Sequence, residues 1–361
     1  MSPDTRPAPT PRQRWLALFQ GGSTDRIPCD YWGTDEVTAR LLGELGCATE
    51  RELWERLGVD RCVRVAAVHR LATERTWYLP SLYSVWHIGT REVSHPGGAG
   101  VYRESVSHPL APVTTVSEVE RFDWPDPDDW DTSGLRAGCR EWSDYPILLG
   151  AYEPFLLHCR LRGMEQALRD LMENEALAEA ILDRIHFIHE SVIRRCLQAA
   201  SDLIDFLWVG EDLGTQESLL MSPTVFRRFL QPRLAAMIAL AHSFGVRVFH
   251  HDDGAIRRLI PELLDMGIDI LNPIQWRCRG MDRAELAREF GSRVVFHGGI
   301  DNQYTLPFGT PEEVRRQVAE NLDIFRGCKG YIVAPCHNIQ PNTPTRNILA
   351  LYAAVHEFGR R

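Results

Sequence analysis

The chain has 361 residues, and 40 Lys and Arg against 49 Asp and Glu give it a formal net charge of −9. Hydrophobic residues make up 44% and charged residues 25%. This composition is typical of a soluble globular protein and excludes disordered, collagen-like and small disulfide-rich chains. The acidic balance, without a basic run, disfavours a nucleic-acid partner, so we expect a small-molecule substrate.

Cysteine usage and the N-terminal residues predict the compartment. The nine cysteines are scattered, odd in number and contain no C-x-x-C pair, which favours reduced thiols in a cytoplasmic protein. The first twenty residues lack the apolar core of a signal peptide. No stretch reaches the roughly 18 apolar residues of a membrane span. We therefore expect a cytoplasmic protein with no membrane partner.

The N-terminal part mixes short helices, strands and a hairpin. Residues 1–12 are rich in proline, and we expect them to fray. Alternating runs between about 76 and 110 flank the turn-forming Pro96-Gly97-Gly98 and predict a β-hairpin that leaves the main pattern. The other predicted elements are a helix over 12–20, a turn into a first strand over 25–31, two helices within 35–57, a strand over 61–65 and a connecting loop over 123–130.

From residue 145 onward, short β-prone runs alternate with longer runs of helical period. Start signals at Ser222-Pro223 and Thr310-Pro311 mark two of the helices. The alternation predicts an α/β fold, a (β/α)8 TIM-type barrel with an N-terminal extension and a hairpin insertion, as one domain over 1–361. No glycine-rich phosphate-binding motif follows a strand. The predicted strands are 146–150, 205–210, 246–251, 269–271, 293–297 and 330–334.

Polar side chains follow the predicted strands, where the reactive groups of a barrel stand. Acid, amide, imidazole and thiol groups recur at these ends, which is more than solvated loops alone require. They include Glu153, Glu211, Asp212, Gln216, His250, His251, Asp252, Asp253, Gln275, His297, Asp301, Gln303, Cys336 and His337.

The run His250-His251-Asp252-Asp253-Gly254 is the most informative of these ends. Residues two apart on a strand point the same way, so His251 and Asp253 share one face. An imidazole beside a carboxylate is able to chelate a divalent metal, with a third ligand from the loop at 336–337. In the alternative interpretation, a histidine caps the sheet and the aspartates cap the following helix.

Other strand ends also have two interpretations. Cys336 is either a metal ligand or a small buried hydrophobe. His297 and Asp301 either bind the substrate or a metal ligand, or belong to a tight Gly298-Gly299 turn with Asp301 capping a helix. Glu153 is a candidate general base.

The sequence resembles the uroporphyrinogen decarboxylase superfamily, and within it the branch of corrinoid-linked methyltransferases. The resemblance covers nearly the whole chain. The stretches that carry it are 25–28 (DRIP), 161–165 (LRGME), 211–216 (EDLGTQ), 221–223 (MSP), 251–254 (HDDG), 267–273 (GIDILNP), 298–301 (GGID), 336–337 (CH) and 343–347 (TPTRN).

The resemblance has two implications for the chemistry. Decarboxylases of the family use an arginine-bearing motif after the first strand, whereas residues 28–33 here (PCDYWG) contain no arginine. The methyltransferase branch binds zinc through H-x-C and a distant cysteine. In this chain Asp253 stands in the first cysteine's place, and the register puts His337, or else Cys336, in the second. The resemblance thus implies zinc on His251, Asp253 and His337 or Cys336, with an open position.

The leading hypothesis is a zinc-dependent, or otherwise divalent-metal-dependent, methyltransferase that acts on a small molecule. A separate corrinoid protein would be methyl donor or acceptor, and a second copy of the chain, in a homodimer, is a further candidate partner. Oxygen ligands make an alkoxide or water partner as credible as a thiol. The alternatives are a cofactor-independent decarboxylase or lyase of the same family acting on a small acid, or a non-catalytic small-molecule-binding barrel. The candidate catalytic residues are Glu153, Glu211 and Asp212, and the candidate substrate-binding residues are Tyr31, Gln216, His250, Gln275, His297, Asp301 and Gln303.

Overall fold

The computed structural model describes residues 8–22, 24–71, 83–94 and 101–360. The chain divides into two compact units. Unit 1 is formed by Met1–Val63, Trp142–Ile147 and Ile270–Arg361, and unit 2 by Arg64–Glu141 and Leu148–Asp269. Whether the chain is one domain, as the sequence predicts, stays a prediction.

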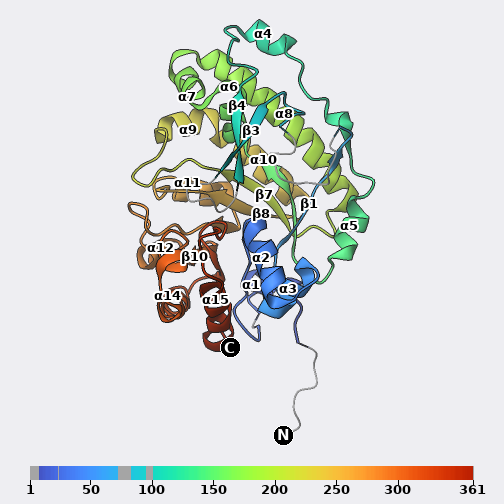
Figure 1. The fold of residues 1–361 in the computed structure, drawn as a ribbon. Coiled ribbons are helices and arrows are strands. Elements are labelled where there is room, and N and C mark those ends of the chain that lie inside the picture. Colours follow the sequence, from blue (N-terminus) through green and yellow to red (C-terminus); the bar gives the residue numbers. More distant parts are fainter. Residues whose placement is uncertain (1–7, 23, 72–82, 95–100, 361) are drawn as a thin grey trace. The chain divides into compact units, whose positions relative to one another are not determined.

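Unit 2 is built on the neighbouring parallel strands β6 (Ile147–Tyr152), β7 (Phe206–Glu211) and β8 (Arg247–Asp252) (Figure 1). The short β1 (Val63–Val65) is next to β6 in the strand order. Parallel strands need long crossovers, and here helices supply them. The helices of the unit are α4 (Val116–Arg121), α5 (Leu135–Glu141), α6 (Pro154–Arg162), α7 (Met164–Glu173), α8 (Glu175–Ala200), α9 (Pro223–Phe229), α10 (Gln231–Ser243) and α11 (Ile260–Met266).

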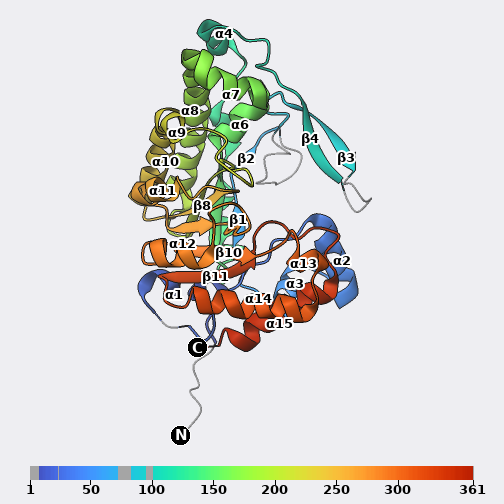
Figure 2. The same ribbon diagram turned by 90° about the vertical axis from the view of Figure 1, so that its left-hand side faces the viewer.

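Two antiparallel pairs complete unit 2. β3 (Gly89–Ser94) and β4 (Val101–Ser107) form a two-stranded ribbon, drawn in cyan in Figure 2. It lies within the stretch where the sequence predicts a hairpin, of which residues 76–82 and 95–100 are outside the described residues. The second pair joins β2 (Val68–His69) to β5 (Trp130–Asp131), which comes directly after the 3-10 turn Pro127–Asp129.

Unit 1 holds the parallel strands β9 (Ile270–Asn272), β10 (Val295–Ile300) and β11 (Gly330–Pro335). Helices α14 and α15 lie against each other, as Figure 2 shows. Capping boxes at Thr10 and Thr310 begin α1 and α14 and confirm the start signal read at Thr310. The helices are α1 (Pro11–Gln20), α2 (Asp35–Leu45), α3 (Glu50–Leu57), α12 (Arg283–Phe290), α13 (Thr305–Phe308), α14 (Pro311–Ile324) and α15 (Thr345–Phe358).

The predicted α/β fold of TIM type is confirmed. Among the described residues, seven strands follow the strand and helix alternation: β1 and β6 to β8 in unit 2, and β9 to β11 in unit 1. The predicted first strand within 25–31 is reduced to two isolated bridges, an antiparallel one between Arg26 and Arg360 and a parallel one between Cys29 and Val333. Pro28 explains part of the loss, because it has no N–H to donate to a ladder. Its carbonyl still accepts from Val333 N at 3.0 Å.

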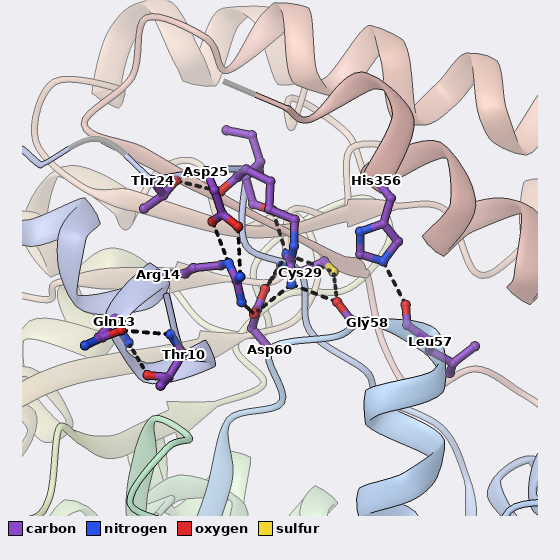
Figure 3. A network of polar contacts seen from close by, with 12 residues as sticks. Thr10, Gln13, Arg14, Thr24, Asp25, Cys29, Leu57, Gly58, Asp60 and His356 are labelled. Carbon is purple, nitrogen blue, oxygen red and sulfur yellow. Dashed lines mark hydrogen bonds and ion pairs between the residues drawn. The ribbon is translucent and has the colours of Figure 1, made fainter. Parts of the chain in front are cut away.

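A buried polar network fixes the N-terminal segments of unit 1 (Figure 3). The Asp60 carboxylate accepts from Arg14 Nη1 at 3.0 Å, Arg26 Nη1 at 2.6 Å and Cys29 N at 3.1 Å. Arg14 also donates to Asp25 at 2.8 Å. Each buried charge is therefore paired, which offsets its desolvation. The network joins α1, the segment at 25–29 and the segment that follows α3.

None of the described helices combines the length with the apolar character that crossing a membrane requires.

Candidate functional site

Three side chains of the kinds that bind metal ions gather at the carboxyl ends of β7 and β8. Asp212, His251 and Asp253 each offer a ligand atom, and these atoms lie within 4.8 Å of one another. His251 Nε2 is 3.5 Å from Asp212 Oδ1 and 3.9 Å from Asp253 Oδ1. The histidine is buried, and the two aspartates are half-buried. We call these three residues the Asp-His-Asp group.

The strand register explains this convergence. Gly210 pairs with His251 and Glu211 with Asp252, so Asp212 and Asp253 are the first residues beyond two strands that end level. The loops that follow touch backbone to backbone, with Gly214 N donating to Asp253 O at 3.0 Å. A Cβ on Gly214 would come within 2.6 Å of Asp253 O, so glycine permits this close approach. The same-face placement of His251 and Asp253 is as the sequence predicts.

Trp208 of β7 holds the histidine ring in place. Its indole stacks on His251 with 4.8 Å between centroids and on Phe249 with 5.3 Å. The indole Nε1 donates to Glu153 Oε1 at 2.9 Å, so the half-buried Glu153 belongs to the same surroundings. Sequence reasoning missed Trp208; the signal was its position on the strand, an even number of residues before Asp212.

The other face of the two strands carries Glu211, His250 and Asp252, which are buried. The Glu211 carboxylate accepts from the backbone N–H of Phe155 at 2.7 Å and Leu156 at 3.1 Å, at the start of α6. Burial raises the pKa of Glu211 well above its ordinary value, and the two N–H donors oppose that rise. Glu211 thus positions α6, while its catalytic role stays a prediction.

His250 has no exposed surface, and its Nε2 lies 3.7 Å from Asp252 Oδ2. Asp252 Oδ1 accepts from Leu213 N at 2.7 Å, which anchors the loop after β7. Burial raises the pKa of Asp252. Substrate contact by His250 stays a prediction, as does that of Gln216, which lies exposed on the loop after β7.

In unit 1 the predicted substrate residues Tyr31 and His297 are buried in polar networks. The Asn272 amide lies 2.7 Å from His297 Nδ1, and Asp30 Oδ2 lies 3.2 Å from Nε2. Tyr31 Oη is 2.9 Å from Thr38 Oγ1. These partners give both side chains a structural use, and their contact with a substrate stays a prediction.

A small cleft in unit 1 is lined by four of the predicted residues, Gln275, Asp301, Gln303 and Cys336, together with Trp276, Arg277 and Asn302. Asp301 accepts from Gln303 N at 3.0 Å and Thr305 N at 2.9 Å just before α13, whose N-cap residue is Tyr304. Whether Asp301 contacts a substrate stays a prediction. Cys336 is buried, and its thiol donates to Ile274 O at 3.0 Å. His337 beside it is half-buried.

The donor set suits a divalent cation. One imidazole nitrogen and two carboxylate oxygens are ligands that zinc and other first-row ions accept. The sequence places Asp212 among the catalytic residues, whereas the structure brings it to His251 and Asp253. His337 and Cys336 belong to unit 1, and their place as ligands stays a prediction.

Comparisons with known proteins agree on the family. A family model described as uroporphyrinogen decarboxylase (URO-D) matches residues 101–358. The methylcobamide:CoM methyltransferase MtaA of Methanosarcina barkeri is 27% identical over 60% of this chain. That match covers 59% of MtaA, so the chain spans about three fifths of this curated relative. A uroporphyrinogen decarboxylase of Pelobacter propionicus is 23% identical over 69% of this chain and 72% of its own.

A solved methyltransferase from Methanosarcina mazei has a TM-score of 0.66 and 20% sequence identity, over 97% of this chain and 99% of that one. At this identity the likeness shows a shared fold.

Proposed function

We propose that this chain, which belongs to the uroporphyrinogen decarboxylase (URO-D) family, is a metal-dependent methyltransferase that acts on a small molecule. The observation that carries the proposal is the Asp-His-Asp group at the ends of β7 and β8. A separate corrinoid protein would serve as methyl donor or acceptor. The relative described as a methylcobamide:CoM methyltransferase supports this partner.

The metal would be held by Asp212, His251 and Asp253, and zinc is the ion we infer first. When bound, a divalent ion supplies Lewis acidity, which favours the deprotonated form of a thiol or hydroxyl that reaches it. Two carboxylates balance the charge of such an ion. An oxygen-rich set, compared with thiolates, keeps more of the positive charge available to the substrate.

Glu153 is the residue we assign to proton transfer. Trp208 Nε1 fixes one carboxylate oxygen of Glu153 at 2.9 Å, and the same indole stacks on His251. A half-buried carboxylate in a set orientation is able to take a proton from a substrate. Trp208 therefore acts as a positioning residue, since it orients both the base and the imidazole.

Decarboxylation is the second candidate, because the uroporphyrinogen decarboxylase of Pelobacter propionicus matches this chain over 72% of its own length. Residues 28–33 contain no arginine. This disfavours decarboxylation, because the resemblance implies that the decarboxylases of the family have an arginine-bearing motif at this place. A smaller acid would be the substrate of such a lyase.

The test is turnover of free methylcobalamin, followed by its absorbance, with zinc-loaded protein and a set of thiol and hydroxyl compounds. We expect wild-type protein to consume methylcobalamin with at least one acceptor. His251→Ala should lose zinc and slow the reaction by at least about a hundredfold. A zinc-free His251→Ala protein with full activity would refute the proposal, and release of carbon dioxide without methylcobalamin would establish the lyase instead.

A further inference from the structure

A groove in unit 2 lies between helix α8 and the segment over 124–128, and its volume is about 730 Å³. That segment leads into the 3-10 turn Pro127–Asp129 and then into β5. Arg195 of α8 donates to the backbone oxygen of Pro127 and so joins the two walls of the groove. No residue of the Asp-His-Asp group lines the groove, which is therefore a separate feature of the unit.

The α8 wall of the groove presents a large apolar side chain. The helix buries Ile181, Ile185 and Ile188 at helical spacing in the core of unit 2. Phe187 lies outside this stripe, lines the groove and is 52% exposed. Trp124 lines the opposite wall. Aromatic side chains placed in this way are enriched at the centres of protein interfaces.

Most charges of the groove are paired within the chain. On α8, Arg194 lies 2.5 Å from Glu190. Between the two walls, Arg195 lies 3.4 Å from Asp128. These four charges therefore cancel, and a partner that docks in the groove does not have to neutralise them.

Two charges of the groove are left over, one on each wall. Among the described residues, neither Arg184 of α8 nor Asp126 of the opposite wall belongs to an ion pair, and both are exposed. The Arg184 guanidinium carbon lies 5.6 Å from the centroid of the Phe187 ring, a contact that leaves its N–H donors available. Asp126 accepts from Asp128 N at 2.9 Å and keeps its negative charge.

This charge pattern favours a second copy of the chain as the partner. Two copies related by a two-fold axis meet through the same surface, so that surface has to be complementary to itself. The groove meets this condition, because Arg184 of one copy is able to pair with Asp126 of the other, and the symmetry repeats the pair. A partner with charges of a single sign would be repelled by one of the two walls.

We propose that this groove is the contact surface of a two-fold symmetric homodimer, in which Phe187 of each copy packs into the groove of the other. The contact uses no residue of the candidate site, so it does not rest on the proposed function.

The experiment is sedimentation velocity of the full chain over a wide range of concentrations. We expect wild type to form a dimer that dissociates on dilution. Phe187→Asp places a charge in the apolar contact and should raise the dissociation constant at least about tenfold. The control is Met172→Asp, because Met172 of α7 is an apolar side chain of the same unit and is 68% exposed. Met172→Asp should dimerise like wild type.

A charge swap identifies the surface more closely. Arg184→Glu and Asp126→Lys should each weaken the dimer, and the double variant should recover most of the loss. Since Arg184 and Asp126 form no ion pair within one described chain, such recovery requires contact between two copies. Wild type that stays monomeric at every concentration, and so leaves the groove to another partner, would overturn the proposal. A dimer that neither Phe187→Asp nor the single charge reversals weaken would also overturn it.

Discussion

At the scale of single residues, the candidate site depends on how an indole, an imidazole and two carboxylates fit against two strands. Trp208 fits because its neighbour along β7 on the same face is glycine. A Cβ on Gly210 would come within 2.6 Å of Trp208 Nε1 and 3.2 Å of His251 Cβ. The missing side chain therefore permits the stacking that orients His251.

Gly210→Ala tests this dependence. The added methyl group should push the indole away from His251 and weaken zinc binding by about 10 to 100 times, the usual loss when a neighbour of a metal ligand is removed. Zinc affinity is measured by competition with a chelator.

The matched control is Gly138→Ala in α5, where a Cβ would meet nothing within 4 Å. Alanine is the better helix former by about 1 kcal/mol, so this variant should be slightly more stable and bind zinc normally. Equal zinc affinity in Gly210→Ala and wild type would show that the stacking has no part in the site.

Sequence reasoning named two of the three residues of the Asp-His-Asp group, His251 and Asp253, as metal ligands. The alternation of a strand is enough to put His251 and Asp253 on one face. The same rule could not decide which of the neighbouring Glu211 and Asp212 faces His251, because the register between β7 and β8 is not known from the sequence. The pairing of Gly210 with His251 gives this register, and Glu211 faces the start of α6 instead.

At the scale of elements, α6 contains a buried histidine, and protonating it in the folded protein is unfavourable. His158 has no exposed surface, and within the described part of the chain neither ring nitrogen has a hydrogen-bond partner. Burial lowers the pKa of His158 to about 4, because the charged form would lose its solvation. In the unfolded chain the pKa is near its ordinary value of 6.5.

This difference makes stability depend on pH. Between pH 6.5 and 4 His158 is protonated in the unfolded chain and neutral in the folded chain. The free energy of unfolding therefore falls as the pH drops through this window. The free energy of unfolding of wild type should fall between pH 7 and pH 5, and we expect this fall to be about 2 kcal/mol smaller in His158→Leu. Denaturant unfolding at the two pH values measures it. Equal losses in both proteins would contradict the assignment.

The same scale shows where sequence patterns succeed. The predicted strands over 146–150, 205–210, 246–251 and 330–334 correspond to β6, β7, β8 and β11 within two residues at each end. Their β-prone runs are buried, and helix start signals flank them. The segment over 26–31 has similar composition, but it forms single bridges, because its polar groups bond to Asp60 and to side chains around Asp30 instead.

At the scale of the whole molecule, family membership and chemistry have to be judged separately. The family model covers residues 101–358, and the relatives include both a methyltransferase and decarboxylases. A shared fold does not decide between these reactions, because function lies in the site placed on the fold. The Asp-His-Asp group is what favours metal-dependent methyl transfer here.

Asp212, the third proposed metal ligand, shows the limit of sequence reasoning at this scale. Asp212 precedes His251 by a whole strand and its connecting helices, and no spacing rule ties two such positions together. The resemblance implied His337 or Cys336 for this place. A carboxylate from the neighbouring strand end became visible only with the paired strands.

The most direct test is the zinc affinity of purified protein, measured by chelator competition for wild type, Asp212→Ala and Glu217→Ala. Glu217 is an exposed carboxylate on the same loop as Asp212 and serves as the control. The account predicts tight zinc binding by wild type and Glu217→Ala. For Asp212→Ala it predicts a loss greater than the roughly 10 to 100 times that follows removal of a neighbour of a ligand. Asp212→Ala protein that binds zinc as tightly as wild type would contradict it.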